Sequence, residues 1–170
     1  MKNIILFISI ALLSTTSVFA QKFAYVDSEY ILERVPEYQS AQDQLDKLSV
    51  NWQNEIEILF QQIDQLYKKF QADQILLTQD MKIKRETEII AKEKEAKELQ
   101  RKRFGPEGDL YVKRQELIKP IQDKAFNAIQ DFSTEKRIDV IFDKSSELIM
   151  LYANSNLDKS DDILKMLGYK

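Results

Sequence analysis

The first long segment of the chain has an apolar face with the period of an α-helix. Between residues 41 and 70, apolar side chains recur at intervals of three or four positions. This spacing places them on one side of a helix, so we predict a long amphipathic helix here. Pro36 suits its first turn, because proline lacks an N–H group that would be unpaired there. The stripe consists of Ala41, Leu45, Leu48, Trp52, Ile56, Leu59, Ile63, Leu66 and Phe70.

The next segment is dominated by charge. Fourteen of the 22 residues from 82 to 103 are charged, and opposite charges recur four positions apart, as in Lys82 and Glu86. Each such pair stabilises a helix by only ~0.2–0.5 kcal/mol, so we predict an exposed helix that buries little. Apolar residues return at helical spacing after the Gly- and Pro-containing break at 104–108. Pro120 predicts a kink in that third run.

The helical segments must fold back on each other, since 68 consecutive residues before the break contain neither glycine nor proline. A turn at the break would give arms of very unequal length, about 100 Å against about 45 Å. A turn near 77–81 gives roughly 60 and 85 Å, and Thr78 can cap the returning helix. We therefore predict a helical hairpin over 38–136, with its tip near 77–81 and a kink at 104–108.

The two ends of the chain differ from the charged middle. Residues 23–26, 138–142 and 148–152 are short runs of β-branched and aromatic side chains, which is typical of strands. The polar residues between the last two runs favour an antiparallel hairpin. A closing helix is expected after Ser160, its N-cap, and before Gly168. Its inner face carries Ile163, Leu164 and Leu167.

Strands at both ends with long helices between them predict an α+β fold. The expected fold is a small β-sheet head, formed by residues 21–37 and 137–170, from which the hairpin projects as a tentacle. A three-stranded sheet and two helices bury only a small core, and an exposed sheet edge invites pairing. We therefore predict an oligomer assembled through apolar side chains of the head strands. The alternative is that these side chains only pack beneath the closing helix of the same chain. The residues proposed for this assembly are Phe23, Tyr25, Val140 and Phe142.

Residues 1–20 have the layout of a secretory signal peptide. Lys2 precedes an apolar core of about ten residues, and small residues lead to Ala20. The core is too short to span a bilayer, which needs ~20 residues. We therefore predict cleavage after Ala20 and an exported protein.

The amino-acid composition excludes most kinds of catalytic site. The 170 residues include no cysteine and no histidine, and only three glycines and three prolines. Disulfides and thiolate metal sites are thus excluded, and the commonest general base and metal ligand is missing. The sequence also lacks a phosphate-binding loop and a nucleophile motif, so we predict no enzymatic activity and no cofactor. The formal net charge of −3 and the predicted export disfavour nucleic-acid binding.

Several segments together resemble the Skp (OmpH-like) family of periplasmic chaperones. They are the strand at 23–27, residues 30–32, Pro36 and the charged hairpin, the strand at 138–142, and residues 157–164. The resemblance covers essentially the whole chain after residue 20. It implies a homotrimer whose sheets join into a β-barrel-like head, with three tentacles enclosing a cavity. Unfolded outer-membrane proteins would be held there without ATP.

The chain differs from that family in net charge: well-known members are basic overall, whereas this chain is acidic. Residues 27–80 carry a net charge of −7, and residues 82–124 carry +4. Charge runs usually mark solvated helix faces, which is one interpretation of this pattern. The other is that basic residues near the tip steer acidic clients or contact an anionic membrane surface. These tip residues are Lys68, Lys69, Lys82, Lys84 and Arg85.

The apolar stripe is expected to pack against the returning helix, which leaves client contact to apolar residues on other faces of the arm. The candidates are Ile58, Phe60, Tyr67 and Leu76. The alternative function is that of a structural coiled-coil adaptor that docks by its tip to one folded envelope partner. A chaperone of this kind would suppress aggregation of several unrelated unfolded proteins, whereas an adaptor would not.

Overall fold

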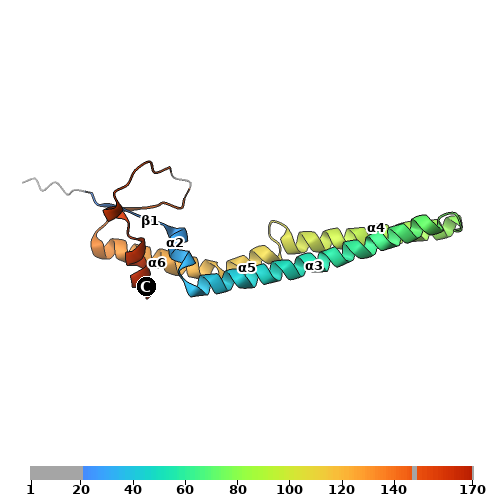
Figure 1. Cartoon of the computed structure of the whole chain (residues 1–170), viewed down its shortest axis with the longest axis horizontal. Helices are drawn as coiled ribbons and strands as arrows, with labels where there is room; N and C mark the ends of the chain where they lie inside the picture. The colour runs from blue at the N-terminus through green and yellow to red at the C-terminus, as the bar shows by residue number, and fades with distance from the viewer. Residues whose placement is uncertain (1–20, 147–148, 170) are drawn as a thin grey trace, which may run out of the picture.

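The computed structural model describes residues 21–146 and 149–169. The predicted signal peptide lies outside these residues. The protein is elongated, with a small head at one end and a two-helix arm that extends from it (Figure 1). Long helices and one small sheet make up the described residues, so the predicted α+β class with a projecting helical hairpin is confirmed.

The outgoing side of the arm is the single helix α3 (Pro36–Asp73). Its 38 residues correspond to a length of about 57 Å. Pro36 occupies the start of the helix and Glu37 lies in its first turn. Five residues of the predicted stripe are buried and the other four are partly buried, so one continuous face of α3 packs against the returning side. The five buried residues are Ala41, Leu45, Ile56, Ile63 and Phe70.

The returning side begins with α4 (Gln79–Phe104). The Thr78 side chain caps this helix by accepting a hydrogen bond from the backbone N–H of Met81 at 3.4 Å. The turn between α3 and α4 occupies residues 74–78, so the predicted tip at 77–81 lies partly inside the first turn of α4. Apolar spacing continues without a break through Leu77 and Met81, which concealed the boundary in the sequence.

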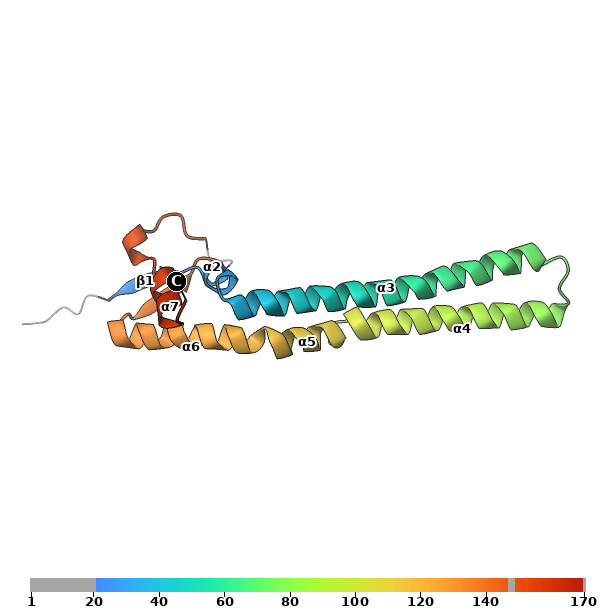
Figure 2. The same cartoon turned by 60° about the horizontal axis from the view of Figure 1, so that its bottom comes forward.

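Two shorter helices, α5 (Asp109–Leu117) and α6 (Lys119–Lys136), complete the returning side (Figure 2). The break between α4 and α5 requires glycine, because a Cβ on Gly105 would lie 2.4 Å from the Arg101 carbonyl oxygen. At Gly108 a Cβ would lie 2.6 Å from the Lys102 carbonyl oxygen. Pro120 lies in the first turn of α6, so the predicted kink takes the form of a boundary between α5 and α6.

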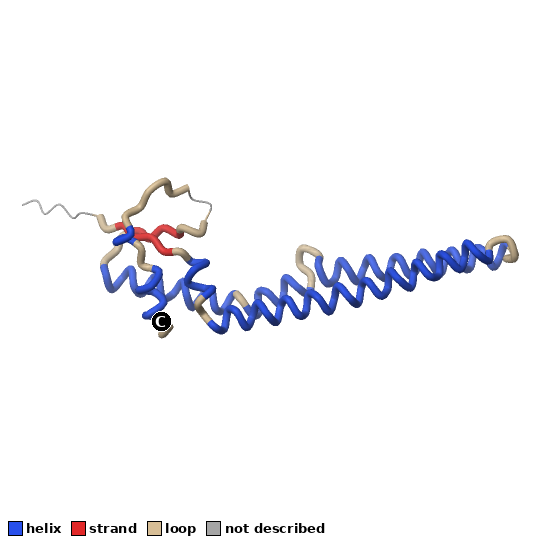
Figure 3. The backbone as a smooth tube through the Cα atoms, in the orientation of Figure 1, coloured by secondary structure: helices blue, strands red, loops and turns tan. Residues whose placement is uncertain are grey.

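The head contains a two-stranded parallel sheet of β1 (Phe23–Val26) and β2 (Val140–Asp143), shown in red in Figure 3. A parallel pair needs a long crossover connection, and here the whole arm provides it. The predicted antiparallel hairpin is wrong, since residues 149–152 form no strand; residues 147–148 lie outside the described part. A turn stabilised by Ser145 and Ser146 hydrogen bonds to Asp143 follows β2. Residues 149–154 form a loop that stands out from the head (Figure 1).

The head core lies between the sheet and three helices, α6, α2 (Ser28–Glu33) and α7 (Ser160–Met166), the last preceded by the short turn η1 (Ser155–Leu157). Ile163 is 0% exposed and Ile31 is 1% exposed. The buried members are Val26, Ile31, Leu32, Ala125, Ala128, Phe132, Ile163 and Leu164.

The start of α7 differs from the prediction. Ser160 is the first residue of the helix, and Lys159 precedes it as the N-cap. The buried Ser160 hydroxyl accepts a hydrogen bond from the Asp27 backbone N–H at 2.9 Å and donates one to Asp158 at 2.6 Å. This serine therefore ties α7 to the end of β1. Gly168 follows the helix with a φ of 89°, in the left-handed region that glycine adopts readily.

Candidate functional site

The tip of the arm exposes aliphatic side chains. Ile75 is 93% exposed and Leu76 is 84% exposed, both in the turn between α3 and α4. Met81 and Ile83, in the first turns of α4, are about half exposed. Exposed apolar side chains that cluster are a stronger sign of a binding surface than single ones. Of this group, only Leu76 was among the predicted client-contact residues.

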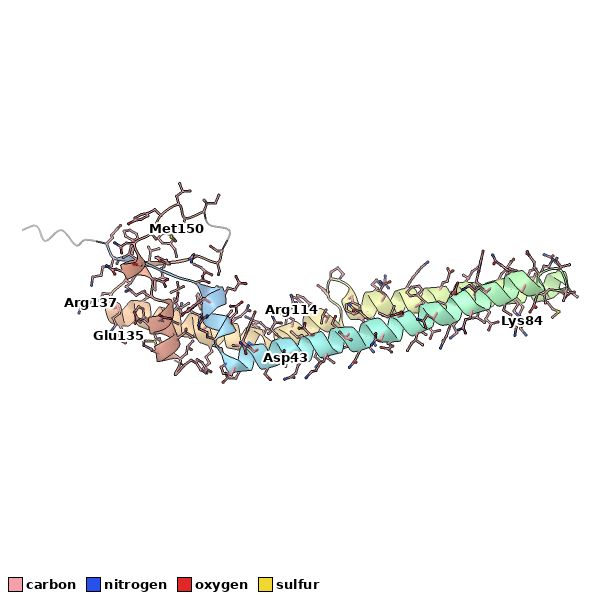
Figure 4. All side chains as sticks on the ribbon, in the orientation of Figure 1. Asp43, Lys84, Arg114, Glu135, Arg137 and Met150 are labelled. Atoms are coloured by element: carbon pink, nitrogen blue, oxygen red, sulfur yellow. The ribbon has the colours of Figure 1, made fainter. Side chains whose placement is uncertain are left out.

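The other predicted client-contact residues lie along α3. Ile58, Phe60 and Tyr67 are all exposed, and they lie off the face that packs against the returning helices. Ile90 on α4 is also exposed. Side chains project outward along the whole arm in Figure 4. The arm therefore offers apolar contacts at separate points from its middle to its tip.

The five predicted basic residues lie at the distal ends of α3 and α4, on both sides of the turn; Lys84 is labelled in Figure 4. Lys68 forms an ion pair with Asp64 at 2.6 Å, and Arg85 lies 3.9 Å from Glu88. Lys69 and Lys84 are exposed and Lys82 is partly exposed. Asp73 and Asp80 flank the turn, so the tip carries both signs of charge. Its cations are accessible, but neighbouring carboxylates reduce their combined field.

The predicted head residues form one apolar face of the sheet. Side chains alternate along β1, so the buried Ala24 and Val26 point to the helices, whereas Phe23 and Tyr25 point the other way. The rings of Phe23 and Phe142 stack with centroids 6.4 Å apart. Phe23, Val140 and Phe142 are exposed and Tyr25 is partly buried.

Next to this face lies a shallow cavity of about 280 Å³. The outward loop after β2 supplies part of its wall, and Met150 of that loop is labelled in Figure 4. Within the loop, Ile149 is 86% exposed and Leu151 is 94% exposed. The outer edge of β2 has no partner strand among the described residues. The head thus combines an open sheet edge with exposed apolar side chains, which is an arrangement that a second chain can cover.

A polar network around Asp143 joins β2 to α2. The backbone N–H and hydroxyl of Ser28 donate to its carboxylate at 3.1 and 2.6 Å, and those of Ser145 donate at 3.1 and 2.8 Å. Partial burial raises the pKa of Asp143, but the hydrogen bonds from Ser28 and Ser145 outweigh it and hold the pKa below its ordinary value. Since hydrogen bonds within the head already engage this carboxylate, the network stabilises the fold.

The described residues contain no group of histidine, cysteine or acidic side chains that could hold a metal ion. Residues 21–146 and 149–169 also include no helix that is both long and apolar enough to cross a membrane. The described residues instead present two exposed surfaces, an apolar and mixed-charge arm and an open sheet face in the head. They define a class of proteins with a helical-hairpin arm on a small α+β head.

Comparison with known proteins identifies the family. A family model described as outer membrane protein (OmpH-like) matches residues 22–167, and the chain belongs to this OmpH-like family. The fold is also similar to the crystal structure of a proposed outer membrane chaperone (OmpH-like) from Caulobacter crescentus CB15. The TM-score is 0.68 at 16% sequence identity, over 91% of this chain and 88% of the other. No curated protein sequence matches the chain.

Proposed function

We propose that this protein is an ATP-independent periplasmic holdase, which binds unfolded outer-membrane proteins between its arms and prevents their aggregation. The observation that carries the proposal is the arm itself, a projecting hairpin that exposes apolar side chains in a member of the OmpH-like chaperone family. The signal peptide, cleaved after Ala20, would deliver the chain to the periplasm. Binding then requires neither a catalytic group nor a cofactor.

The spacing of the exposed apolar residues suits an unfolded client. Ile58, Phe60, Tyr67 and Leu76 are distributed along the distal part of the arm instead of forming one pocket. Such a surface makes many weak contacts with any apolar segment and selects for no single sequence. An unfolded chain pays an ordering cost when it is held tightly, so scattered contacts favour a client that stays mobile.

Assembly through the head would bring several arms around one space. We propose a homotrimer in which Phe23, Tyr25, Val140 and Phe142 pack against neighbouring chains. The exposed sheet face and the free edge of β2 support this proposal, because no other described residues of the same chain cover them. Mass measurement in solution tests it. A wild-type monomer would contradict it, and Phe142→Ser is expected to shift a trimer toward monomer.

The basic residues at the tip are proposed to steer acidic clients, or an anionic membrane surface, toward the arms. Steering of this kind acts on the association rate more than on affinity, and it weakens with salt. Reversing Lys68, Lys69, Lys82, Lys84 and Arg85 should lower the client association rate and flatten its salt dependence. The control reverses five exposed cations elsewhere: Lys47, Lys102, Lys113, Arg114 and Lys119. An unchanged rate in the tip variant would refute steering.

An aggregation assay tests the holdase proposal directly. Several unrelated β-barrel outer-membrane proteins are unfolded in urea, then diluted into nucleotide-free buffer with a stoichiometric amount of the protein. Light scattering is expected to be suppressed for each client. If the protein instead leaves all of them to aggregate and binds one folded envelope protein, it is a structural adaptor.

The same assay tests the client-contact residues. Replacing Ile58, Phe60, Tyr67 and Leu76 with serine should weaken suppression, because these exposed side chains contribute little to the fold. The matched control replaces four exposed glutamines with serine, Gln62, Gln65 and Gln71 on α3 and Gln74 in the turn. Equal suppression by both variants would show that client contact lies elsewhere on the arm.

A further inference from the structure

Two cores of buried apolar residues lie inside the arm, and the buried Ile56 lies between them along α3. A distal core joins α3 to α4, and a proximal core joins α3 to α5 and to the start of α6. Neither core spans the whole arm, so the alignment of the two halves also depends on the contacts between the cores. The buried members are Ile63, Phe70, Ile89 and Ala96 in the distal core, and Ala41, Leu45 and Ile118 in the proximal core.

The returning side is interrupted between these cores. The chain leaves helical geometry at residues 105–108, and the loop stands out from the arm in Figure 3. Opposite it, the rings of Trp52 and Phe104 meet edge to face with centroids 6.3 Å apart. Only α3 runs through this region as an unbroken helix, so α3 alone joins the two halves by continuous helical structure.

Arg103 connects all three helices at this place. Its Nη2 lies 3.2 Å from the Glu55 carboxylate on α3, and its Nη1 donates to the Asp109 carboxylate on α5 at 2.6 Å. Its guanidinium also lies over the Trp52 ring, 4.9 Å from the centroid. The Glu55 contact ties α4 to α3, whereas the Asp109 contact closes the loop at 105–108. One side chain from the end of α4 thus holds both the cross-arm and the cross-loop links.

These links are polar, and within the described part of the chain the Arg103 guanidinium does not use all of its hydrogen-bond donors. The hydrogen bond to Asp109 raises the pKa of Arg103 and Glu55 adds to this, while desolvation opposes it, so the guanidinium stays charged. Yet its Nε is buried without a hydrogen-bond partner among the described residues. Both carboxylates are partly exposed, so water can replace them when the contact opens. This contact is therefore much easier to open than an aliphatic core.

We propose that Arg103, Glu55, Asp109 and Trp52 form a clasp that closes a joint in the middle of the arm. When the clasp opens, the distal half swings relative to the proximal half by bending of α3, which limits the amplitude. The joint itself is a property of the arm and does not depend on clients.

Spin-label distance measurements test the joint in the full-length protein without client. The chain has no cysteine, so a pair of introduced cysteines can be labelled specifically. One pair, at the exposed positions Gln71 and Gln115, spans the joint, and a second pair, Gln71 and Gln100, lies within the distal half. Labelled chains are diluted with unlabelled chains, so that distances within one chain dominate.

Arg103→Gln is expected to broaden the distance distribution of the spanning pair roughly twofold and to leave the distal pair unchanged. Glu55→Gln, which removes only the cross-arm link, should broaden it as well. Lys102→Gln, an exposed neighbour with the same change of charge, should leave both pairs unchanged. The proposal is overturned if Arg103→Gln changes neither pair, or if it broadens both pairs equally, which would indicate local unfolding of the arm. Since no client is present, these outcomes are independent of holdase activity.

Discussion

The head and the distal half of the arm bury apolar residues in different ways. The head core gathers residues from β1, α2, α6 and α7, which lie at opposite ends of the chain. The distal core uses one face of each of two neighbouring helices. Contacts in the head therefore form only when both chain ends meet, whereas contacts in the arm form along a local hairpin. This difference predicts a cooperative head and an arm that opens in parts.

The largest expected effect is in the head. Ile163→Ala removes a side chain that is fully buried among α2, α6 and α7, so it should lower the free energy of unfolding by about 2–5 kcal/mol. Urea unfolding monitored by circular dichroism measures this change. The exposed neighbour Lys165 supplies the control, and Lys165→Ala should leave stability nearly unchanged. If the two variants were equally stable, Ile163 would not belong to a cooperative core.

A smaller, local effect is expected in the arm. Ala96 is 0% exposed between α4 and α3, so Ala96→Leu forces the helices apart at a cost of about 1–3 kcal/mol. Hydrogen exchange should accelerate in α4 and in the distal half of α3 while the head stays protected. Ala91→Leu, at an exposed position of the same helix, should change neither the stability nor the hydrogen exchange of the arm. Equal acceleration in the head would show that the two regions unfold together.

The same contrast explains what the sequence could predict. The stripe on α3, the break at 105–108 and the cap at Thr78 depend on neighbouring residues, so periodicity and turn chemistry located them closely. The partner of β1 lies beyond the whole arm, and local pattern carries no information on such pairing. The prediction therefore had an antiparallel hairpin where the structure has one parallel pair.

The candidate site residues could likewise be predicted only where a local sequence pattern marked them. The four predicted client-contact residues are all exposed. Helical spacing placed Ile58, Phe60 and Tyr67 off the packed stripe, whereas Leu76 is exposed because it lies in the turn. The exposed Ile75 was missed, since it lies in the turn, where helical spacing no longer defines a face. Ile83 and Ile90 were missed for another reason: α4 has too few apolar residues to show which face is buried. The Arg103 clasp joins three segments in space, and no local signal in the sequence marks it.

Removing the charge of Asp143 tests how much the polar network around this residue stabilises the head. Its hydrogen bonds from Ser28 and Ser145 favour the ionised form and lower its pKa in the folded state. Its contribution to stability is therefore complete above the unfolded pKa of about 3.9, and it is lost as pH falls through the lower folded value. Asp143→Asn should destabilise the head by about 1–2 kcal/mol near pH 7.

The pH dependence separates this effect from a packing defect. Because the wild type loses the contribution in acid and the variant never has it, their stabilities should converge below about pH 4. Urea unfolding at a series of pH values measures this. A constant difference at all pH values would mean that the charge of Asp143 contributes nothing. Asp131→Asn, at an exposed position of α6, provides a comparison of equal charge change.

The smallest effect is expected at the tip, where a cap is the main local stabilisation of the start of α4. Thr78→Ala removes the acceptor for the Met81 backbone N–H and should cost about 0.5–1 kcal/mol, near the low end for caps because the site is exposed. Only amides in the first turn of α4 should exchange faster. Thr87→Ala, inside the same helix, removes a hydroxyl that donates to the Ile83 carbonyl and should leave exchange at the tip unchanged. If Thr78→Ala instead accelerated exchange throughout the arm as far as the break at 105–108, the distal half would unfold as one cooperative unit. The boundary between independently unfolding regions would then lie at the joint, and the distal half would not open in parts.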